Sequence, residues 1–317
     1  MNVVFMGTPD FAKESLQAIY HAGHKIVGVV TNPDKPKGRG MKLVPSEVKN
    51  FALEEGLKIY QPVKIKKNEA FMEEIRNLNP DVICVVAYGK LLPKTILDIP
   101  KYGCINVHAS LLPKYRGAAP IQWAVLNGDK TTGVTTMYMD TGMDTGDVIL
   151  KEEIQIEEDE TTGQLWDKLA KMGGELLVKT LQQIEKGVAP REKQANAFTI
   201  APMLSKEMAR IDWNSKTAQE IKNLVRGLNP IMGAYTYLNG RKIKFWKVAI
   251  VTEEIDVGKI EALKNGTILI SNAKEGLFVK TKEGILKVLE IQGENAKRMP
   301  IQDFLRGNKI EKSEIFE

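Results

Sequence analysis

The run DVICVVAY at residues 81–88 is apolar at almost every position. Such continuity is typical of a strand inside a parallel sheet, where helices cover both faces and neither side of the strand meets water. Around this run, short apolar segments alternate with amphipathic segments at helical spacing. The alternation predicts an α/β fold with a Rossmann-like, mostly parallel sheet. We expect strands at 2–7, 25–31, 81–88, 103–108, 134–139 and 147–156, and helices at 9–23, 46–56, 69–78 and 161–187.

The pattern of apolar and polar residues changes after residue 187. Residues 190–204 have little periodicity and are interpreted as a linker. Beyond it, one expected helix at 217–228 is followed by short apolar runs separated by glycine turns such as Asn239-Gly240 and Glu283-Gly284. Short strands with frequent turns predict a smaller C-terminal, OB-like β-barrel. The expected domains are 1–189, which is catalytic, and 205–317, which is the barrel.

Composition narrows the class of protein. The 317 residues carry a net charge of +5, and residues 205–317 hold 20 basic against 15 acidic side chains, so the excess lies in the C-terminal part. This charge fits either a solvated surface or nucleic-acid contact. Cys84 and Cys104 lie in apolar runs and are expected to be reduced core thiols. The first residues lack a signal-peptide pattern, and no apolar run approaches about 18 residues, so we expect a cytoplasmic protein without membrane contact.

Nucleotide-binding motifs are missing from the N-terminal strand and turn. The segment VVFMGTPDFA has one glycine, Gly7, where a dinucleotide site needs Gly-x-Gly-x-x-Gly, and no phosphate-binding Gly-x-x-x-x-Gly-Lys motif occurs. Binding of NAD or ATP is therefore disfavoured. Gly7 is expected to allow a tight turn before the first helix.

Two polar side chains stand at the end of the predicted strand 103–108. Asn106 and His108 share one face of that strand, because side chains alternate with a period of two. Ligand sites in open α/β sheets form beyond the carboxyl ends of strands, where His108 lies. A lone buried histidine is more often structural than catalytic, but the asparagine beside it favours a site. Asparagine can hydrogen-bond a carbonyl oxygen, and histidine exchanges a proton near neutral pH.

A carboxylate would complete this set. The segment MDTGMDTGDVI offers Asp140, Asp144 and Asp147 in a glycine-rich loop that could also be an ordinary turn. A carboxylate beside His108 would fix its tautomer and favour its charged form. Neither a nucleophilic partner for His108 nor metal-ligand spacing occurs. The set therefore indicates group transfer to a nucleophile that the substrate brings, with stabilisation of an oxyanion.

The segments INVHASLLPKYRGAAPIQWAV (105–125) and GMDTGD (142–147) resemble the folate-dependent formyltransferase family. The resemblance extends from the first strand through the C-terminal domain. It implies a formyltransferase fold, 10-formyltetrahydrofolate as co-substrate, and no metal. It also implies catalytic roles for Asn106, His108 and Asp144, whereas Asp140 and Asp147 do not match. The implied folate contacts are Ser110, Leu111, Leu112, Pro113, Val86, Ala87, Tyr88, Gly89, Leu91 and Leu92.

Within the family, the basic segment NPDKPKGRGMKL (32–43) and the C-terminal domain resemble the members that act on tRNA. The implied acceptor is the α-amine of initiator methionyl-tRNA, used in translation initiation. The segment follows the second strand and would lie beside the site, although such a loop is often only a solvated surface. The implied tRNA contacts are Lys35, Lys37, Arg39 and Lys42, with Arg39 the main discriminating residue. We expect a monomer.

Two other functions stay open on the sequence. Formyltransferases that act on sugar nucleotides share the Asn, His and Asp set and the Ser-Leu-Leu-Pro segment. The basic segment and the positive C-terminal part argue against a sugar acceptor. A catalytically silent RNA- or folate-binding protein is the second alternative, and the complete catalytic set argues against it.

Overall fold

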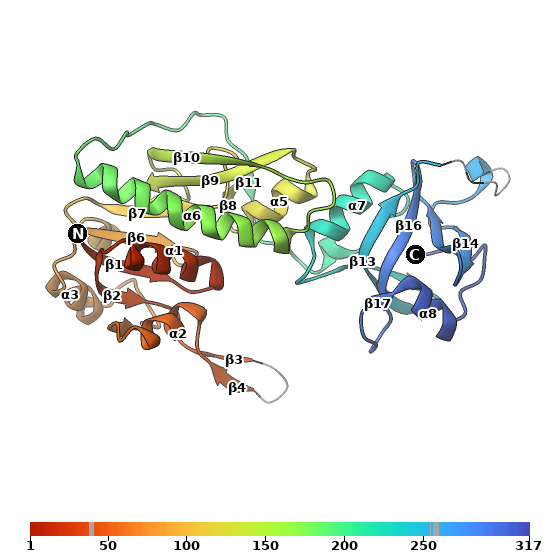
Figure 1. The fold of residues 1–317 in the computed structure, drawn as a ribbon, viewed down its shortest axis with the longest axis horizontal. Helices are drawn as coiled ribbons and strands as arrows, with labels where there is room; N and C mark the ends of the chain where they lie inside the picture. Colours follow the sequence, from red (N-terminus) through yellow and green to blue (C-terminus); the bar gives the residue numbers. More distant parts are fainter. Residues whose placement is uncertain (38–40, 254, 256–259) are drawn as a thin grey trace. The chain divides into compact units, whose positions relative to one another are not determined.

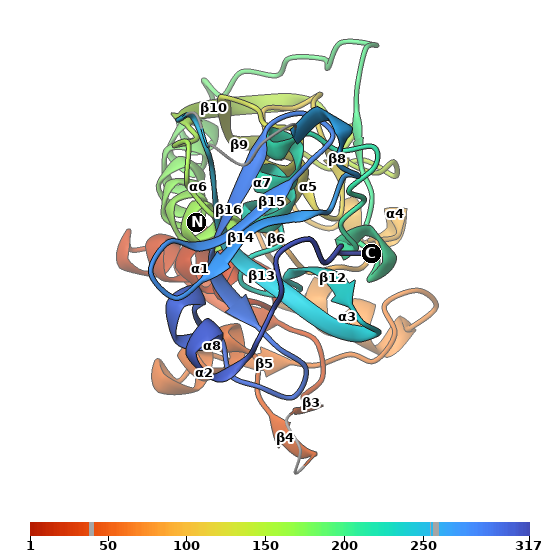
Figure 2. The ribbon, with the colours of Figure 1, turned by 90° about the vertical axis from the view of Figure 1, so that its right-hand side faces the viewer.

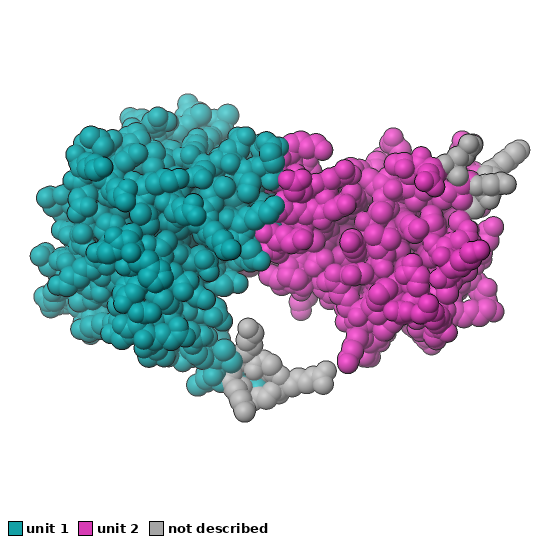
Figure 3. Space-filling model, viewed as in Figure 1, with its two compact units in different colours: residues 1–121, 131–155, 165–202 teal, residues 122–130, 156–164, 203–317 magenta. Residues whose placement is uncertain are grey.

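A computed structural model describes residues 1–37, 41–253, 255 and 260–317 of the chain. The chain forms two compact units, coloured separately in Figure 3. Unit 1 comprises residues 1–121, 131–155 and 165–202, and unit 2 comprises 122–130, 156–164 and 203–317. The predicted boundaries at 189 and 205 stay a prediction.

Unit 1 is built on a seven-stranded sheet with the order β10-β9-β7-β6-β1-β2-β5. The five strands from β7 to β5 are parallel, β9 is antiparallel to them, and β10 is antiparallel to β9 and so runs in the same direction as the five. The predicted α/β fold is therefore confirmed (Figure 1). The strands are β1 (Asn2–Gly7), β2 (Lys25–Val30), β5 (Ile59–Tyr60), β6 (Val82–Val86), β7 (Cys104–His108), β9 (Thr131–Tyr138) and β10 (Val148–Gln155).

Helices cover both faces of this sheet. One buried cluster joins Val4, Met6 and Val85 of the strands to Phe71 and Ile75 of α3. On the opposite face, Gly173 of α6 packs against Val107 and Val134. The helices with a part in unit 1 are α1 (Asp10–His21), α2 (Glu47–Glu54), α3 (Glu69–Asn77), α4 (Lys94–Leu97), α5 (Pro120–Leu126) and α6 (Thr162–Glu185); α5 and α6 each continue into unit 2.

Gly7 is required for a different reason from the expected turn. A Cβ at this position would lie 2.6 Å from the Cβ of Ala12 and 2.9 Å from the carbonyl oxygen of Val86. The glycine therefore allows β1, β6 and α1 to approach closely, which is a matter of packing rather than of an unusual backbone conformation.

Two small pairings in unit 1 were not predicted. The segment 32–43 contains an antiparallel hairpin of β3 (Lys35–Lys37) and β4 (Lys42–Val44), where we expected a loop. In addition, β8 (Arg116–Gly117) pairs in parallel with β11 (Ile200–Ala201). Proline and lysine are poor strand formers, and two-residue strands have no periodicity to detect, so neither pairing could be predicted from local sequence.

Unit 2 contains an antiparallel sheet of order β12-β13-β16-β15-β14, with β17 beside β16 (Figure 2). The predicted hairpins at Asn239-Gly240 and Glu283-Gly284 are confirmed, and Asn239 and Gly240 both have positive φ. The elements are η1 (Glu207–Ala209), α7 (Ala218–Gly227), β12 (Ala234–Leu238), β13 (Arg241–Ile250), η2 (Ile260–Ala262), β14 (Ile268–Asn272), β15 (Gly276–Lys280), β16 (Ile285–Gln292), β17 (Met299–Pro300) and α8 (Ile301–Gly307).

The last residues of the chain join the two edges of this sheet. Ser313 N–H donates to the carbonyl of Ile268 on β14, at 2.9 Å. Glu317 N–H donates to the carbonyl of Tyr237 on β12, also at 2.9 Å. Segment 313–317 therefore lies between β14 and β12 and closes the sheet, as a barrel requires.

Candidate active site

β7 brings Asn106 and His108 to the carboxyl edge of the sheet. This strand pairs in parallel with β6 and antiparallel with β9. Both side chains lie on the same face because they are two residues apart. Asn106 is half-buried, and its side chain makes no hydrogen bond among the described residues, so its amide is available to a ligand.

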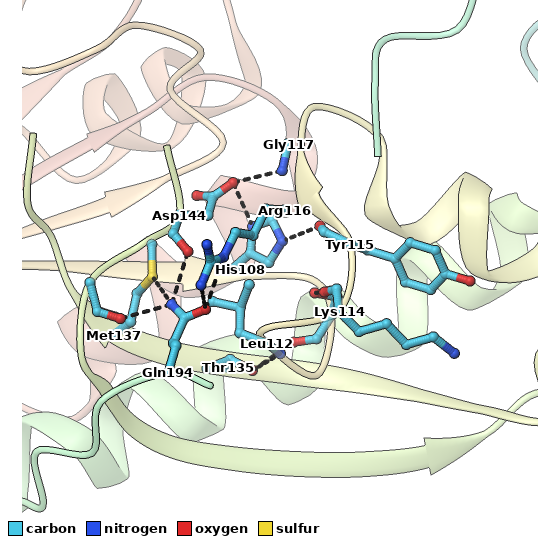
Figure 4. A network of polar contacts seen from close by, with 12 residues as sticks. His108, Leu112, Lys114, Tyr115, Arg116, Gly117, Thr135, Met137, Asp144 and Gln194 are labelled. Carbon is cyan, nitrogen blue, oxygen red and sulfur yellow. Dashed lines mark hydrogen bonds and ion pairs between the residues drawn. The ribbon is translucent and has the colours of Figure 1, made fainter. Parts of the chain in front are cut away.

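The imidazole of His108 is buried, with 6% of the residue exposed. Its Nε2 lies 2.8 Å from the carbonyl oxygen of Tyr115. A carbonyl oxygen can only accept, so Nε2 carries a proton and donates it to that oxygen. Nδ1 faces the Oδ2 atom of Asp144 at 3.7 Å, which is too long for a hydrogen bond. Nδ1 is therefore the ring nitrogen that no hydrogen bond from the described residues occupies (Figure 4).

Asp144 is the aspartate that faces His108. Its Oδ2 accepts a hydrogen bond from Gly117 N–H at 2.8 Å, which fixes the carboxylate beside the imidazole. The other two aspartates of the loop are engaged elsewhere. Asp140 accepts from Thr145 Oγ1 at 2.6 Å, and Asp147 pairs with Arg191 at 2.8 Å.

Gln194 connects the Asp144 loop to Arg116. Its Nε2 donates to the carbonyl oxygens of Asp144 and Gly146, both at 2.8 Å. Its Oε1 accepts from Nε and Nη2 of Arg116 at 3.0 and 2.7 Å. Gln194 belongs to the predicted linker 190–204, so part of that segment lies against the candidate site (Figure 4).

The segment Ser110–Pro113 is fixed by side chains that point inward. Ser110 is fully buried, and its hydroxyl donates to the carbonyl of Lys114 at 2.5 Å. Leu112 is fully buried beside Met137. Thr135 of β9 donates to the carbonyl of Ser110 at 2.6 Å and accepts from Leu112 N–H at 3.1 Å. Of the predicted folate contacts Ser110–Pro113, only Leu111 and Pro113 are half-buried and leave side-chain surface exposed.

The segment 86–92 follows β6 at the same edge of the sheet. Val86, Tyr88 and Leu92 are buried. Ala87, Gly89 and Leu91 are exposed, so they present backbone and apolar surface. Asn32 Nδ2 donates to the carbonyl of Tyr88 at 3.0 Å and fixes the turn. An edge of exposed backbone groups and apolar side chains fits a flat heterocycle with amide-like hydrogen-bonding groups.

The hairpin β3–β4 has a polar anchor at its base. Asp34 contacts Nζ of Lys49 at 2.7 Å and Nε2 of Gln61 at 2.8 Å, and these hydrogen bonds lower the pKa of Asp34. Lys35 is exposed on β3. The backbones of Lys37 and Lys42 pair across the hairpin, whereas Arg39 lies outside the described residues.

Both cysteines are free and buried, as predicted. Burial raises the pKa of the Cys84 thiol far above its usual range and raises that of Cys104 to about 12. Within the described ranges, no group of three or more His, Cys, Asp and Glu side chains could hold a metal ion. Among the same residues, every helix is too short or too polar to span a bilayer.

A cavity of about 820 Å³ lies in unit 2, apart from the residues discussed so far. Its lining combines the Trp213 and Phe316 rings with the charged side chains of Arg210 and Lys264. None of the predicted catalytic or folate-binding residues lines it. The polar geometry around His108, rather than cavity size, therefore marks the candidate site.

Sequence reasoning missed the residues that hold the set together. No role at the site was predicted for Gln194, Arg116 or Thr135, although Arg116 lies in the segment 105–125 that indicated the site. A threonine inside the apolar run VTTMYM was a usable signal for Thr135. Gln194 lies in a polar segment, where no sequence signal indicated its role.

Comparison with known proteins identifies the class of protein. A family model described as "Formyl transferase" matches residues 1–181, and one described as "Formyl transferase, C-terminal domain" matches 203–309. The chain belongs to the formyl transferase family.

Particular relatives match over their whole length. The chain is 52% identical to a protein of Clostridioides difficile named methionyl-tRNA formyltransferase, over 98% of each chain. It is 48% identical to a protein of the same name from Ruminiclostridium cellulolyticum, over 99% of each.

Solved structures share the fold. An N-formyltransferase of Helicobacter canadensis in complex with folinic acid and dTDP-3-aminofucose matches with a TM-score of 0.69 at 20% identity, over 93% of this chain and 100% of that one. HypX of Aquifex aeolicus in complex with tetrahydrofolic acid matches with a TM-score of 0.62 at 15% identity. That match covers 99% of this chain and 50% of HypX, so this chain spans about half the length of HypX.

Proposed function

We propose that this enzyme transfers the formyl group of 10-formyltetrahydrofolate to the α-amine of initiator methionyl-tRNA. The observation that carries the proposal is the His108–Asp144 pair beside the free amide of Asn106, in a chain about half identical to methionyl-tRNA formyltransferases over its full length. This arrangement has polar groups for an oxyanion and leaves the nucleophile to the substrate.

The catalytic residues act on the charge that develops on the formyl oxygen. When bound, the folate supplies a formyl carbon that the amine can attack. The Asn106 amide and the Nδ1–H of protonated His108 donate hydrogen bonds to the formyl oxygen. Asp144 stabilises the imidazolium and takes up the amine's proton through a water molecule. The bond between the formyl carbon and N10 of the folate then breaks, and N10 leaves as a neutral amine after it has received a proton. His108 keeps its orientation throughout, because Nε2–H stays bonded to Tyr115.

The folate binds along the exposed parts of residues 86–92 and 110–113. Backbone groups at Ala87 and Gly89 meet the edge of the pterin, and the apolar Leu91 and Leu111 cover its faces. Tyr88 and Leu112 shape this wall from behind because both are buried.

Two basic surfaces serve tRNA binding. The family resemblance implies contact of Lys35, Lys37, Arg39 and Lys42 with the acceptor end, and of these the side chain of Lys35 is exposed on the hairpin β3–β4. On unit 2, the Lys242 ammonium lies 3.6 Å from the centre of the Tyr235 ring, and the Arg210 guanidinium lies 5.5 Å from that of Tyr237. We call these four residues the basic–aromatic strip. Cations placed over aromatic rings suit phosphates and bases together.

A sugar nucleotide is the competing acceptor, because structures of sugar N-formyltransferases share this fold. The full-length relatives and the basic surfaces favour tRNA. The test offers methionyl-tRNA and a dTDP-amino sugar separately to the purified protein with 10-formyltetrahydrofolate. We expect product from the tRNA alone, and formylation of the sugar alone would refute the proposal. The protein is expected to act as a cytoplasmic monomer, which sedimentation of the purified chain would check.

A further inference from the structure

We propose that Gln194 is a positioning residue for the reaction, which holds the Asp144 loop against His108 and is itself oriented by Arg116. The inference rests on the proposed formyl transfer. It starts from four hydrogen bonds of the Gln194 amide, which join residues 50 and 78 positions away in the sequence, in addition to the contact of its Nε2 with Met137 Sδ at 3.9 Å (Figure 4).

The orientation of the Gln194 amide is fixed by its partners. Arginine can only donate, so the atom that faces Arg116 must be Oε1. Backbone carbonyls can only accept, so the atom that faces Asp144 and Gly146 must be Nε2. Both N–H groups and two acceptor positions are used, and a rotation by 180° would break all four bonds.

The Asp144 backbone needs such support. Asp144 has a φ of +55°, a left-handed conformation that costs free energy for a residue with a Cβ. Gln194 bonds the carbonyl of this same residue, while Gly117 N–H holds its carboxylate. The main chain and the side chain of Asp144 are therefore fixed by two separate segments.

The neighbouring Gly146 fixes the loop on its other side. A Cβ at Gly146 would lie 1.7 Å from the carbonyl oxygen of Tyr138, so the loop is packed tightly against the end of β9. The second N–H of Gln194 bonds the Gly146 carbonyl. Gln194 thus bridges Asp144 to the part of the loop that is packed against the end of β9.

Arg116 supplies a rigid reference for Gln194. Only 8% of Arg116 is exposed, and the Phe198 ring lies 4.6 Å from its guanidinium carbon. The backbone on both sides is paired, because Arg116 N–H donates to the carbonyl of Thr199 at 2.9 Å and Ala118 N–H to that of Ala201 at 2.9 Å. Segment 190–202 is therefore held in register with β8, and Gln194 is held with it.

This arrangement predicts an effect on turnover rather than on binding. Gln194 does not contact the carboxylate of Asp144, so its loss moves that carboxylate relative to His108 without removing a ligand contact. A displacement of about 1 Å at a reacting group can slow a reaction about a hundredfold.

The Gln194→Glu variant distinguishes two roles of Gln194. One is positioning of the Asp144 loop, and the other is anchoring of segment 190–202 to Arg116. A glutamate keeps an acceptor for Arg116, but it places a second oxygen against the carbonyls of Asp144 and Gly146. Gln194→Met, of similar length, removes all four bonds. Asn196→Ala, an exposed neighbour in the same segment, is the matched control.

The experiment measures kcat and KM for both substrates, together with amide hydrogen exchange of residues 142–148 in the free full-length chain. We expect kcat to fall about tenfold to a hundredfold in both Gln194 variants, with KM within about twofold. Exchange should accelerate in residues 142–148 in both, and Asn196→Ala should behave as the wild type.

Wild-type turnover in Gln194→Glu would overturn the inference, whether or not Gln194→Met is slow. It would show that only the bond to Arg116 matters and that the bonds to Asp144 and Gly146 do not. Unchanged exchange in both variants would also overturn it. If Gln194→Glu does not fold, normal kcat or normal exchange in Gln194→Met overturns it. A wild-type protein that fails to formylate methionyl-tRNA refutes the proposed function instead, and the exchange measurement still decides the role of Gln194.

Discussion

At the scale of single residues, the contacts of His108 decide which of its nitrogens can act. Nε2–H is bonded to the Tyr115 carbonyl, and Nδ1 faces Asp144 across 3.7 Å. In the proposed mechanism, the Asp144 carboxylate stabilises the imidazolium that donates to the formyl oxygen. The charge of Asp144 is therefore the property to test.

Asp144→Asn removes this charge and keeps the shape of the side chain. The asparagine can still accept from Gly117 N–H, so the fold should be retained. We expect kcat to fall about a hundredfold to ten-thousandfold, since a positioned acid–base group contributes this much. Steady-state kinetics and the midpoint of thermal unfolding check it. Turnover close to that of the wild type would show that the carboxylate has no catalytic role.

Tyr88 gives a prediction on stability at high pH. Its hydroxyl is buried without a hydrogen-bond partner among the described residues, and burial raises its pKa to about 12. In the unfolded chain the phenol ionises near pH 10, about its ordinary value. Between about pH 10 and 12 the unfolded state therefore loses a proton that the folded state keeps, and the free energy of unfolding decreases as the pH rises.

Tyr88→Phe should remove this contribution. We expect the variant to be as stable as the wild type or slightly more stable at pH 8, because no hydrogen bond is lost. At pH 11 its advantage should grow by about 1 kcal/mol. Urea denaturation at both pH values measures the difference. A constant difference between the proteins across this range would show that Tyr88 does not titrate as described.

At the scale of secondary-structure elements, the strands and helices with a clear hydrophobic pattern were predicted from the sequence. The run at 81–88 became β6, and the Asn-x-His segment became β7, with Asn106 and His108 at its carboxyl end. Helix α5 was missed because its seven residues lie inside a segment interpreted by its motif rather than by its pattern. The hairpin β3–β4 was missed because its lysines and prolines favour a loop.

The polar connections between elements were beyond sequence reasoning. Gln194 reaches Asp144 over 50 residues and Arg116 over 78, and no local pattern specifies such pairs. Asp34 is similar, since its bonds to Lys49 and Gln61 hold the base of the hairpin across three segments. Such contacts depend on the packing of the whole unit, whereas the strand order depends on apolar runs alone.

At the scale of the whole molecule, residues 205–317 carry an excess of positive charge, and two of their basic side chains, Lys242 and Arg210, belong to the basic–aromatic strip. The basic–aromatic strip lies on β12 and β13, with Arg210 beside them. Because such a surface neutralises phosphates, binding to tRNA should release counterions and weaken as salt rises. Folate binding in unit 1 should depend on salt much less.

The strip can be tested by the salt dependence of binding. We expect the double variant Lys242→Ala with Arg210→Ala to raise the Kd for methionyl-tRNA and to reduce the slope of log Kd against log salt by about one to two. Lys274→Ala is the control, because it also removes a lysine charge but lies on the exposed β14–β15 turn, outside the strip. Fluorescence anisotropy of labelled tRNA between low and moderate salt measures it. An unchanged slope in the double variant would exclude the strip from the tRNA contact.

The most direct test of the central claim is a single-turnover assay with 10-formyltetrahydrofolate and initiator methionyl-tRNA, comparing the wild type with His108→Ala. We predict that the wild type produces N-formylmethionyl-tRNA and that His108→Ala is slower by about a thousandfold or more, with its folded structure retained. No formylated product from the wild type, or equal rates in the two proteins, would contradict the account.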